Sequence, residues 1–363
     1  MSDLNLASLK SAILAETVPF VGVDLRSADI SVEPGQGNAG PRALVNLGYP
    51  VDDIRAELAE FIGDVIGSNL GLSRVGVEVT WRVRARAVQG TLSPLPEVRN
   101  VVAVASGKGG VGKSTTTVNL ALALSRQGAR VGVLDADIYG PSQPKMLGLE
   151  GQQPVSKDGK SFEPLEAYGL QVISVGFLVD EQTPVIWRGP MVTQALNQLV
   201  FSTRWRDLDY LIVDLPPGTG DTQLTLTQQV PLAGAVIVTT PQDIALLDAR
   251  RGLKMFEKVN VRVLGIVENM SVHICMACGH EEALFGSGGG QRLSDESEVP
   301  LLGQLPLDAR IRREADGGEP TVVADPDGPL AARYLETARA MSARLASAPR
   351  DRKGAFGKIV VES

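Results

Sequence analysis

The chain has 363 residues, 44% of them apolar and 21% charged, with a formal net charge of −7. This length allows one large and one small domain with ordinary buried cores, and the negative charge disfavours a broad nucleic-acid-binding surface. No stretch approaches the roughly 20 apolar residues that span a bilayer, and no basic segment precedes an apolar one near the N-terminus, so we expect a globular, cytoplasmic protein without a membrane or nucleic-acid partner.

Residues 1–88 are predicted to form a small α/β domain, because apolar residues recur there first at helical and then at strand spacing. The expected elements are a helix within residues 4–16, strands at 18–23, 30–32 and 43–47, a helix from about Asp52 to Ile66, and a strand at 75–81. This pattern indicates one sheet covered by at least one helix.

A proline-containing segment at residues 89–97 is predicted to link this domain to a larger one at residues 98–348. The larger domain should have strands at residues 101–105, 131–134, 170–175, 210–213, 235–239, 263–267 and 301–305, and helices at 113–126, 191–201, 244–259 and 329–345. Because these strands are apolar throughout, we expect a doubly wound, mostly parallel α/β sheet that binds ligands beyond its carboxyl ends. In the polar tail, residues 349–363, the run at 358–361 is expected to be an edge strand or to lack structure.

A glycine-rich loop follows the first strand of the larger domain and reads GKGGVGKST over residues 107–115. Its glycines let successive backbone N–H groups point at phosphate oxygens, and the next helix directs its positive end at the same anion. Lys113 should reach the β- and γ-phosphates of ATP, and the Ser114 hydroxyl should bind Mg²⁺. The residues expected to contact the nucleotide are Gly107, Lys108, Gly109, Gly110, Val111, Gly112, Lys113, Ser114 and Thr115.

Lys108 is a second lysine in this loop, and a solvated loop lysine is one interpretation. The loop also resembles the deviant Walker A class, GKGGxGK[ST], in which the extra lysine crosses a dimer interface to the partner's nucleotide. That resemblance implies a homodimer that sandwiches two ATP molecules, with Lys108 and Lys113 acting in catalysis.

Three further segments are predicted to complete the nucleotide site. Asp135 and Asp137 follow the second strand, and the segment DIYGPS resembles a first switch in which Asp137 orients the attacking water, with Asp135 in support. The segment DLPPGTGD is read as a Walker B strand end and second switch: Asp214 should hold Mg²⁺, and the Gly218 N–H should sense the γ-phosphate. Asn269 matches the position whose side-chain amide contacts adenine in similar proteins. The alternative is that this asparagine only forms a turn.

The only cysteines and histidines of the chain lie between His273 and His280. Cys275 and Cys278 form a C-x-x-C pair, which in a cytosolic chain indicates a metal or redox site more than a structural disulfide. An iron–sulfur cluster takes about four thiolates, so two chains would complete the set. A zinc site with both histidines, a disulfide and a thioredoxin-like pair are the alternatives, and the last two fit a cytosolic protein and a late loop poorly.

The segments ENMS, C-x-x-C and FGxGGG, together with the loop and switch segments, resemble the Mrp/ApbC family of iron–sulfur cluster carrier ATPases, of MinD/ParA-like fold, over about residues 98–310. This resemblance implies an ATPase homodimer in which Cys275 and Cys278 of each chain bind one [4Fe–4S] cluster. The cluster would come from a scaffold donor and pass to apo-proteins, with hydrolysis coupled to loading or transfer. Residues 1–88 resemble the MIP18-like (DUF59) domain of such carriers, but they contain no cysteine, which favours a docking or structural role.

Two other classes of protein share the nucleotide motifs. A MinD/ParA-type spatial regulator should carry a basic amphipathic C-terminal helix or a basic surface and has no use for the paired cysteines. A small-molecule kinase should show an acceptor-binding motif or a lid, and none is recognisable.

Overall fold

The structure is a computed structural model that describes residues 18–33, 42–71, 75–90, 92–178, 189–275 and 277–351. The helix predicted within residues 4–16 and the run at 358–361 lie outside the described residues. None of the helices in the described part of the chain combines the length and the apolar character needed to cross a bilayer.

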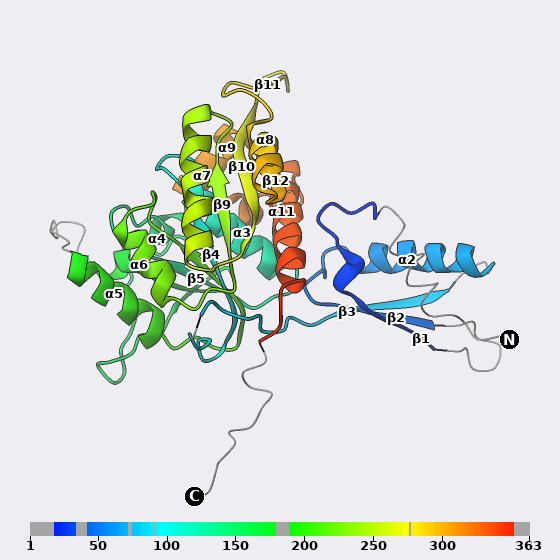
Figure 1. The fold of residues 1–363 in the computed structure, drawn as a ribbon, viewed down its shortest axis with the longest axis horizontal. Helices are drawn as coiled ribbons and strands as arrows, with labels where there is room; N and C mark the ends of the chain where they lie inside the picture. The colour runs from blue at the N-terminus through cyan, green and yellow to red at the C-terminus, as the bar shows by residue number, and fades with distance from the viewer. Residues whose placement is uncertain are drawn as a thin grey trace, which may run out of the picture.

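The N-terminal part is a three-stranded sheet with one helix packed on it (Figure 1). Its elements are η1 (Leu25–Ser27), β1 (Asp29–Glu33), β2 (Arg42–Leu47), α2 (Arg55–Leu70) and β3 (Gly76–Trp81). Strand β2 pairs antiparallel with β1 and parallel with β3, and the core includes the buried side chains of Val45, Leu58 and Ile62. The helix that the sequence predicts from about Asp52 begins at Arg55 in the structure.

Residues 18–23 do not form the predicted strand, because the chain turns there. The Val23 N–H donates to the Phe20 carbonyl at 3.2 Å, and Gly22 has a φ of +81°. A Cβ at Gly22 would lie 2.5 Å from the Glu336 carbonyl oxygen, so only glycine lets this turn lie against the last helix. The apolar run is thus a packing segment and not a strand.

The larger part is built on a single sheet that, within the described residues, has nine strands. They are β4 (Val98–Ala105), β5 (Val131–Asp135), β6 (Leu165–Ala167), β7 (Leu170–Ser174), β8 (Leu208–Asp214), β9 (Gly234–Thr239), β10 (Val263–Ile274), β11 (Glu281–Glu282) and β12 (Leu301–Leu307). The order is β11-β10-β9-β4-β8-β5-β7-β6, with β12 also pairing with β10. All neighbours are parallel except β6 with β7 and β10 with β11, which confirms the doubly wound, mostly parallel sheet.

Helices cover this sheet because its central strands are buried along their whole length. The helices are α3 (Lys113–Arg126), α4 (Gln143–Met146), η2 (Val175–Phe177), α5 (Gly189–Ser202), α6 (Asp221–Gln229), α7 (Asp243–Lys258), α8 (Gly289–Ser297), α9 (Ala309–Asp316), α10 (Thr321–Ala324) and α11 (Pro329–Ala346). The four helices predicted here are present, and α4, η2, α6, α8, α9 and α10 were not predicted, because they are short or rich in glycine and polar residues.

Helix α11 lies between the two parts of the molecule (Figure 1). On one side it packs against α3 and β12, and on the other Ala343 and Ala346 enter the core of the N-terminal sheet. Arg339 of α11 donates to Asp53 at 2.5 Å and to the Val21 carbonyl at 2.7 Å. The N-terminal sheet is therefore anchored to the larger part through α11 as well as through the chain between β3 and β4.

Strand β10 continues well beyond residue 267, where the sequence pattern predicted its end. With β11 it forms a hairpin that projects from the carboxyl end of the sheet (Figure 1). Asn269 consequently lies inside the strand and not at its end. The strand extends because its distal part pairs with β11 and β12, a long-range pairing that a local apolar run does not reveal.

Candidate nucleotide site and cysteine hairpin

The glycine-rich loop connects β4 to α3 at the carboxyl end of the sheet. Gly110 and Gly112 both have a φ of +80°, which favours glycine. A Cβ on Gly112 would lie 2.1 Å from Asn269 Nδ2, and one on Gly107 would lie 2.3 Å from the backbone of Asp248 in α7. The loop is therefore held between β10 and α7, and its shape depends on these glycines.

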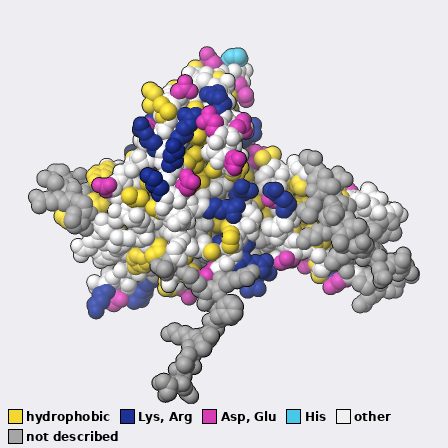
Figure 2. Space-filling view, viewed as in Figure 1, with side chains coloured by type: hydrophobic (Ala, Val, Ile, Leu, Met, Phe, Trp, Pro, Cys, Tyr) yellow, Lys and Arg dark blue, Asp and Glu magenta, His cyan; other side chains and the backbone are white. Residues whose placement is uncertain are grey.

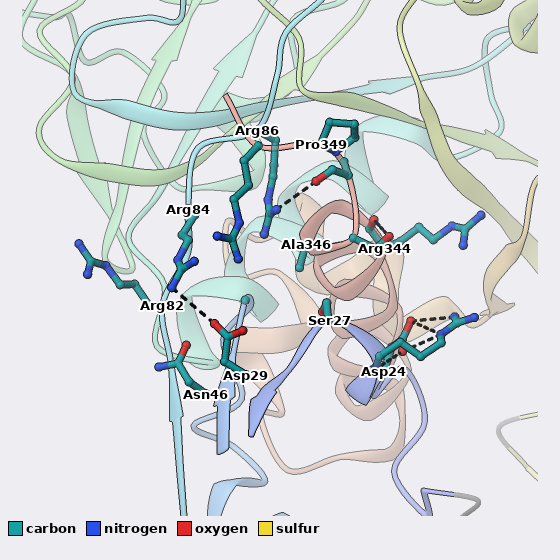
Figure 3. Close-up of a pocket in the computed structure, with 15 residues that line it drawn as sticks. Asp24, Ser27, Asp29, Asn46, Arg82, Arg84, Arg86, Arg344, Ala346 and Pro349 are labelled. Carbon is teal, nitrogen blue, oxygen red and sulfur yellow. Dashed lines mark hydrogen bonds and ion pairs between the residues drawn. The ribbon is translucent and has the colours of Figure 1, made fainter. Parts of the chain in front are cut away.

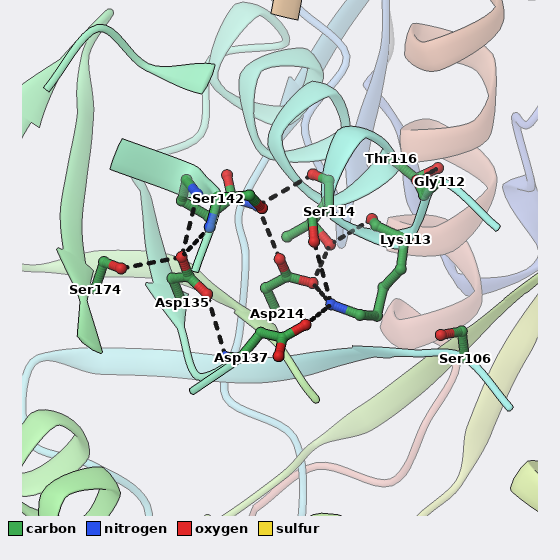
Figure 4. Close-up of polar contacts among 12 residues, drawn as sticks. Ser106, Gly112, Lys113, Ser114, Thr116, Asp135, Asp137, Ser142, Ser174 and Asp214 are labelled. Carbon is green, nitrogen blue, oxygen red and sulfur yellow. Dashed lines mark hydrogen bonds and ion pairs between the residues drawn. The ribbon is translucent and has the colours of Figure 1, made fainter. Parts of the chain in front are cut away.

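Lys113 is buried in the centre of a cluster of acidic groups (Figure 4). Its Nζ lies 2.5 Å from Asp214 Oδ1, 3.6 Å from Asp137 Oδ2 and 3.2 Å from the Ser114 hydroxyl. A buried ammonium group in this position neutralises carboxylates that would otherwise repel one another. The structure thus brings together four residues predicted from three separate motifs.

Asp135 and Asp214 are both fully buried at neighbouring strand ends. Asp135 accepts hydrogen bonds from the backbone N–H groups of Asp137, Ser142 and Gln143, at 3.1–3.2 Å, and from the Ser174 hydroxyl at 3.0 Å. Burial and the nearby Asp214 raise the pKa of Asp135 to about 7, against the opposing effect of these hydrogen bonds and of Lys113. Asp135 organises the backbone of residues 137–143.

Asp137 projects into the same cluster from the segment after β5 (Figure 4). Burial raises the pKa of its carboxyl group, while the ion pair with Lys113 opposes that effect. Its Oδ1 atom is buried and has no hydrogen-bond partner among the described residues. One oxygen of this carboxylate is therefore available to a ligand or a water molecule.

Gln143 is a buried member of the site that the sequence analysis did not identify. Its Nε2 donates to Asp214 Oδ2 at 2.9 Å and to the Ser114 carbonyl at 3.1 Å, so it links the Walker B strand to the phosphate loop helix. Its Oε1 atom is buried without a partner among the described residues. Its position directly after the DIYGPS segment is the only signal that could have indicated it.

These groups fit a magnesium ion that accompanies a nucleotide. Mg²⁺ takes oxygen ligands and usually retains several waters, so it needs few protein groups. The Ser114 hydroxyl, Asp214 and the unpartnered oxygens of Asp137 and Gln143 supply such a donor set.

Two groups that are predicted to contact a nucleotide have other partners in this structure. The Gly218 N–H, predicted to sense the γ-phosphate, donates to the Ser106 carbonyl at 2.9 Å. Lys108 is half-buried, and its Nζ lies 3.4 Å from Gln242 Oε1 at the start of α7. The Gly218 N–H must leave the Ser106 carbonyl before it can contact a phosphate, whereas the Lys108 ammonium group has three N–H donors and can keep its contact with Gln242.

Asn269 contacts the phosphate loop directly, since its Nδ2 donates to the Val111 carbonyl at 2.9 Å. The side chain therefore supports the loop in this structure, and a contact with adenine stays a prediction. Nearby, the Glu268 carboxylate accepts from the Gly290 N–H and from Gln304 Nε2. A Cβ on Gly290 would lie 2.9 Å from the Glu268 Cβ, so a glycine at this position of the FGxGGG segment allows the close contact with the ENMS segment.

The cysteine pair occupies the tip of the β10–β11 hairpin. The Cys275 N–H donates to the His280 carbonyl at 3.0 Å, and the Gly279 N–H donates to the Cys275 carbonyl at 2.8 Å, which closes a tight turn. Both thiols are free; Cys275 is half-buried and Cys278 is exposed. Hydrogen bonds from the backbone N–H groups of Ala277 and Cys278 lower the pKa of the Cys275 thiol.

The zinc alternative requires both histidines beside both cysteines. His273 instead lies in strand β10, opposite Glu282 of β11 in the backbone register of the hairpin. Among the described residues no group of three or more His, Cys, Asp or Glu side chains is placed to hold a metal ion. The four-ligand zinc site is therefore not assembled in this structure.

Comparisons with known proteins bear on both sites. The ParA family model, described as NUBPL iron-transfer P-loop NTPase, matches residues 97–342. An iron-sulfur cluster carrier protein from Pseudomonas fragi is 60% identical over 273 residues, which cover 75% of this chain and 95% of that protein. The iron-sulfur cluster transfer protein NUBPL from Mus musculus is 50% identical over 258 residues, which cover 70% of this chain and 81% of that protein.

Among solved structures, a nucleotide-binding protein from Archaeoglobus fulgidus in complex with ADP is similar at 36% sequence identity with a TM-score of 0.56. The likeness covers 64% of this chain and 90% of that one. The cell division ATPase MinD from Pyrococcus furiosus, at 22% identity and a TM-score of 0.51, shows the same fold.

Proposed function

The chain belongs to the ParA family of iron-transfer P-loop NTPases, and we propose that it is an ATP-hydrolysing carrier of iron–sulfur clusters. One observation carries this proposal: strand β10, which ends at Ile274, contacts the phosphate loop through Asn269 and leads directly into the turn with the free thiols of Cys275 and Cys278. The strand is bulged between Asn269 and His273, and Met270 has a φ of +57°, so the six residues from Asn269 to Cys275 span less than the roughly 20 Å of fully extended chain. One strand and the turn after it thus join the ATPase site to the cluster site.

In this proposal the chain's own residues bind and orient MgATP. Lys113 exchanges Asp214 for the β- and γ-phosphates, which frees the aspartate for the cation. Asp137 orients the attacking water through its carboxylate, and Gln143 fixes Asp214 relative to Ser114. Mg²⁺, when bound, supplies charge neutralisation on the phosphates.

The cargo is proposed to be a [4Fe–4S] cluster held between two copies of the chain. One chain offers two thiolates, and such clusters take about four. The lowered pKa of Cys275 favours the thiolate form that binds iron. Within the cytoplasm, a scaffold protein would supply the cluster and apo-proteins would receive it.

Exposed apolar side chains support a homodimer. Tyr139 beside the nucleotide cavity is 68% exposed, and Ile244 and Leu247 on the first turns of α7 are 69% and 53% exposed. Figure 2 shows apolar side chains on the surface over α7, below the projecting tip that carries a histidine. A partner on this face would bring its own Lys108 and cysteine hairpin to the interface, as the resemblance to the deviant Walker A class implies.

A transfer experiment tests the proposal. Cluster-loaded protein is mixed anaerobically with an apo iron–sulfur enzyme, and the recovery of that enzyme's activity is followed with MgATP and with a non-hydrolysable analogue. We expect transfer in both cases, with a rate that depends on which nucleotide is present. Recovery no faster than with free iron and sulfide would contradict a carrier function.

A further inference from the structure

A second cavity lies where the N-terminal sheet meets α11, away from the nucleotide site (Figure 3). Its volume is about 780 Å³, within the usual range of small-molecule pockets. Its walls come from η1 and β1, the residues after β3, and the C-terminal end of α11 with the segment that follows. It shares no residue with the cavity at the phosphate loop.

The lining of this cavity is strongly basic. Its charged residues are Arg26, Arg82, Arg84, Arg86, Arg344, Arg350, Asp24 and Asp29. Asp24 pairs with Arg26 at 2.8 Å and Asp29 with Arg84 at 3.6 Å. Six arginines against two aspartates leave an excess of four positive charges, in a chain whose net charge is −7.

Arg86 occupies the inner wall and is only 5% exposed. Its Nη1 donates to the Ala348 carbonyl at 3.0 Å, and no described carboxylate compensates its charge. Burial lowers the pKa of its guanidinium group, and the nearby positive charges of Arg350 and Arg84 lower it further. Clustering these cations is unfavourable unless an anion joins them.

Two other polar atoms of the lining have no partner. Ser27 Oγ and Arg344 Nε are buried and make no hydrogen bond to any described residue. Native proteins satisfy most buried polar atoms, so these two donors point to an absent acceptor. In Figure 3 the Arg84 side chain extends from the segment after β3 toward Asp29 of β1, and the Arg86 side chain lies beside the segment that follows α11.

We infer that this arginine cavity binds a compact anion that carries two or more phosphate groups. Guanidinium groups bind phosphate oxygens bidentately, and the arginines that line this cavity come from three chain segments. No described residue of the lining is aromatic, so only the arginine side chains could stack on a base. The ligand class is therefore an inorganic polyphosphate or a similar small polyphosphate.

Such a ligand would connect the two parts of the molecule. It would touch η1 on one side, and on the other side both the segment after β3 and the end of α11. Bound anion should thus hold the N-terminal sheet on α11 and raise the temperature of thermal unfolding. This inference does not depend on the proposed carrier function.

Calorimetric titration of the full chain with tripolyphosphate and with pyrophosphate tests the inference. The Lys113→Ala background, without Mg²⁺, keeps these anions from the phosphate loop. We expect one site per chain and, in the Arg84→Gln/Arg350→Gln variant, affinity weakened about a hundredfold, because each lost charged hydrogen-bond donor costs about tenfold. The control Arg250→Gln/Arg312→Gln removes two charges from exposed pairs on α7 and α9 and should bind normally.

Equal affinity in the Arg84/Arg350 variant and its parent would overturn the inference, as would equal losses in the control. Citrate serves as a polycarboxylate comparison, and tighter binding of citrate would contradict the phosphate class. Circular dichroism and thermal unfolding of the Arg84/Arg350 variant establish that it is folded. Both side chains are exposed enough for the substitution to be tolerated.

Discussion

Lys113 Nζ and Asp214 Oδ1 lie 2.5 Å apart, so the lysine of the phosphate loop and the aspartate at the end of β8 form a buried ion pair. Both groups are ones that a bound MgATP would need. Nucleotide binding therefore has to exchange one ion pair for two contacts, lysine with phosphate and aspartate with the cation. The same pair also holds α3 against the sheet, which links the stability of the fold to the nucleotide site.

The two lysines of the loop should behave differently when removed. Lys113→Ala should abolish ATP binding and also destabilise the protein by about 3–5 kcal/mol, because Asp214 and Asp137 lose their buried counter-charge. Lys108→Ala should leave ATP bound and slow hydrolysis, because its proposed target is the partner's nucleotide. Fluorescent-nucleotide titration and phosphate release measure the two effects, and equal loss of binding in both variants would contradict the role of Lys108 across the interface.

Asp137→Ala should produce a protein that binds ATP and does not turn it over. The carboxylate lies 3.6 Å from Lys113 and has one unpartnered oxygen, a geometry suited to positioning a water molecule. Single-turnover phosphate release should fall by at least about a hundredfold. Release at the rate of the unmodified protein would remove Asp137 from the mechanism.

Gln143→Ala should weaken Mg²⁺ binding and spare nucleotide binding. The substitution removes the hydrogen bond to Asp214 and the unpartnered Oε1 atom. Loss of such a supporting group raises the Mg²⁺ concentration for half-maximal hydrolysis by about tenfold or more. The exposed Gln152, changed to alanine, is the matched control. An unchanged Mg²⁺ titration would show that Gln143 only packs.

In cluster-free protein, Cys275 should be alkylated at lower pH than an ordinary thiol. Its pKa is lowered by the N–H groups of Ala277 and Cys278, so a larger fraction is thiolate, the reactive form, at a given pH. Iodoacetamide labelling followed by mass spectrometry gives the rate at each cysteine against pH. We expect the midpoint for Cys275 below the ordinary thiol value and shifted up in Cys278→Ala, which loses the side-chain hydrogen bond. A midpoint for Cys275 at the ordinary thiol value would contradict this.

The fold was predictable where the signal is local. The apolar strands and the turn from β4 into α3 follow from runs of neighbouring residues, and α3 has the bounds that the sequence predicts. Features that depend on partners far along the chain were not predictable. Gln143 matters because it touches Ser114 and Asp214, and β10 extends to Ile274 because β11 pairs with it.

The cavity between the N-terminal sheet and α11 illustrates the same limit. Arg84, Arg86 and Arg350 are ordinary charged residues in the sequence, and only folding brings them together. Gly218 differs, because the sequence shows the motif to which it belongs. The motif does not predict the hydrogen bond from the Gly218 N–H to the Ser106 carbonyl. Sequence patterns thus predicted residues that the fold brings together, but not the hydrogen-bond partners that these residues have in the structure.

We propose that two chains share one cluster through four cysteines. The most direct test is the iron, sulfide and zinc content of the protein after anaerobic reconstitution, measured with the molar mass in solution. We expect about four irons per dimer, none in Cys275→Ala or Cys278→Ala, and an unchanged content in His273→Ala and His280→Ala. A monomer that holds one zinc ion per chain, and loses it when either histidine is changed, would contradict this proposal.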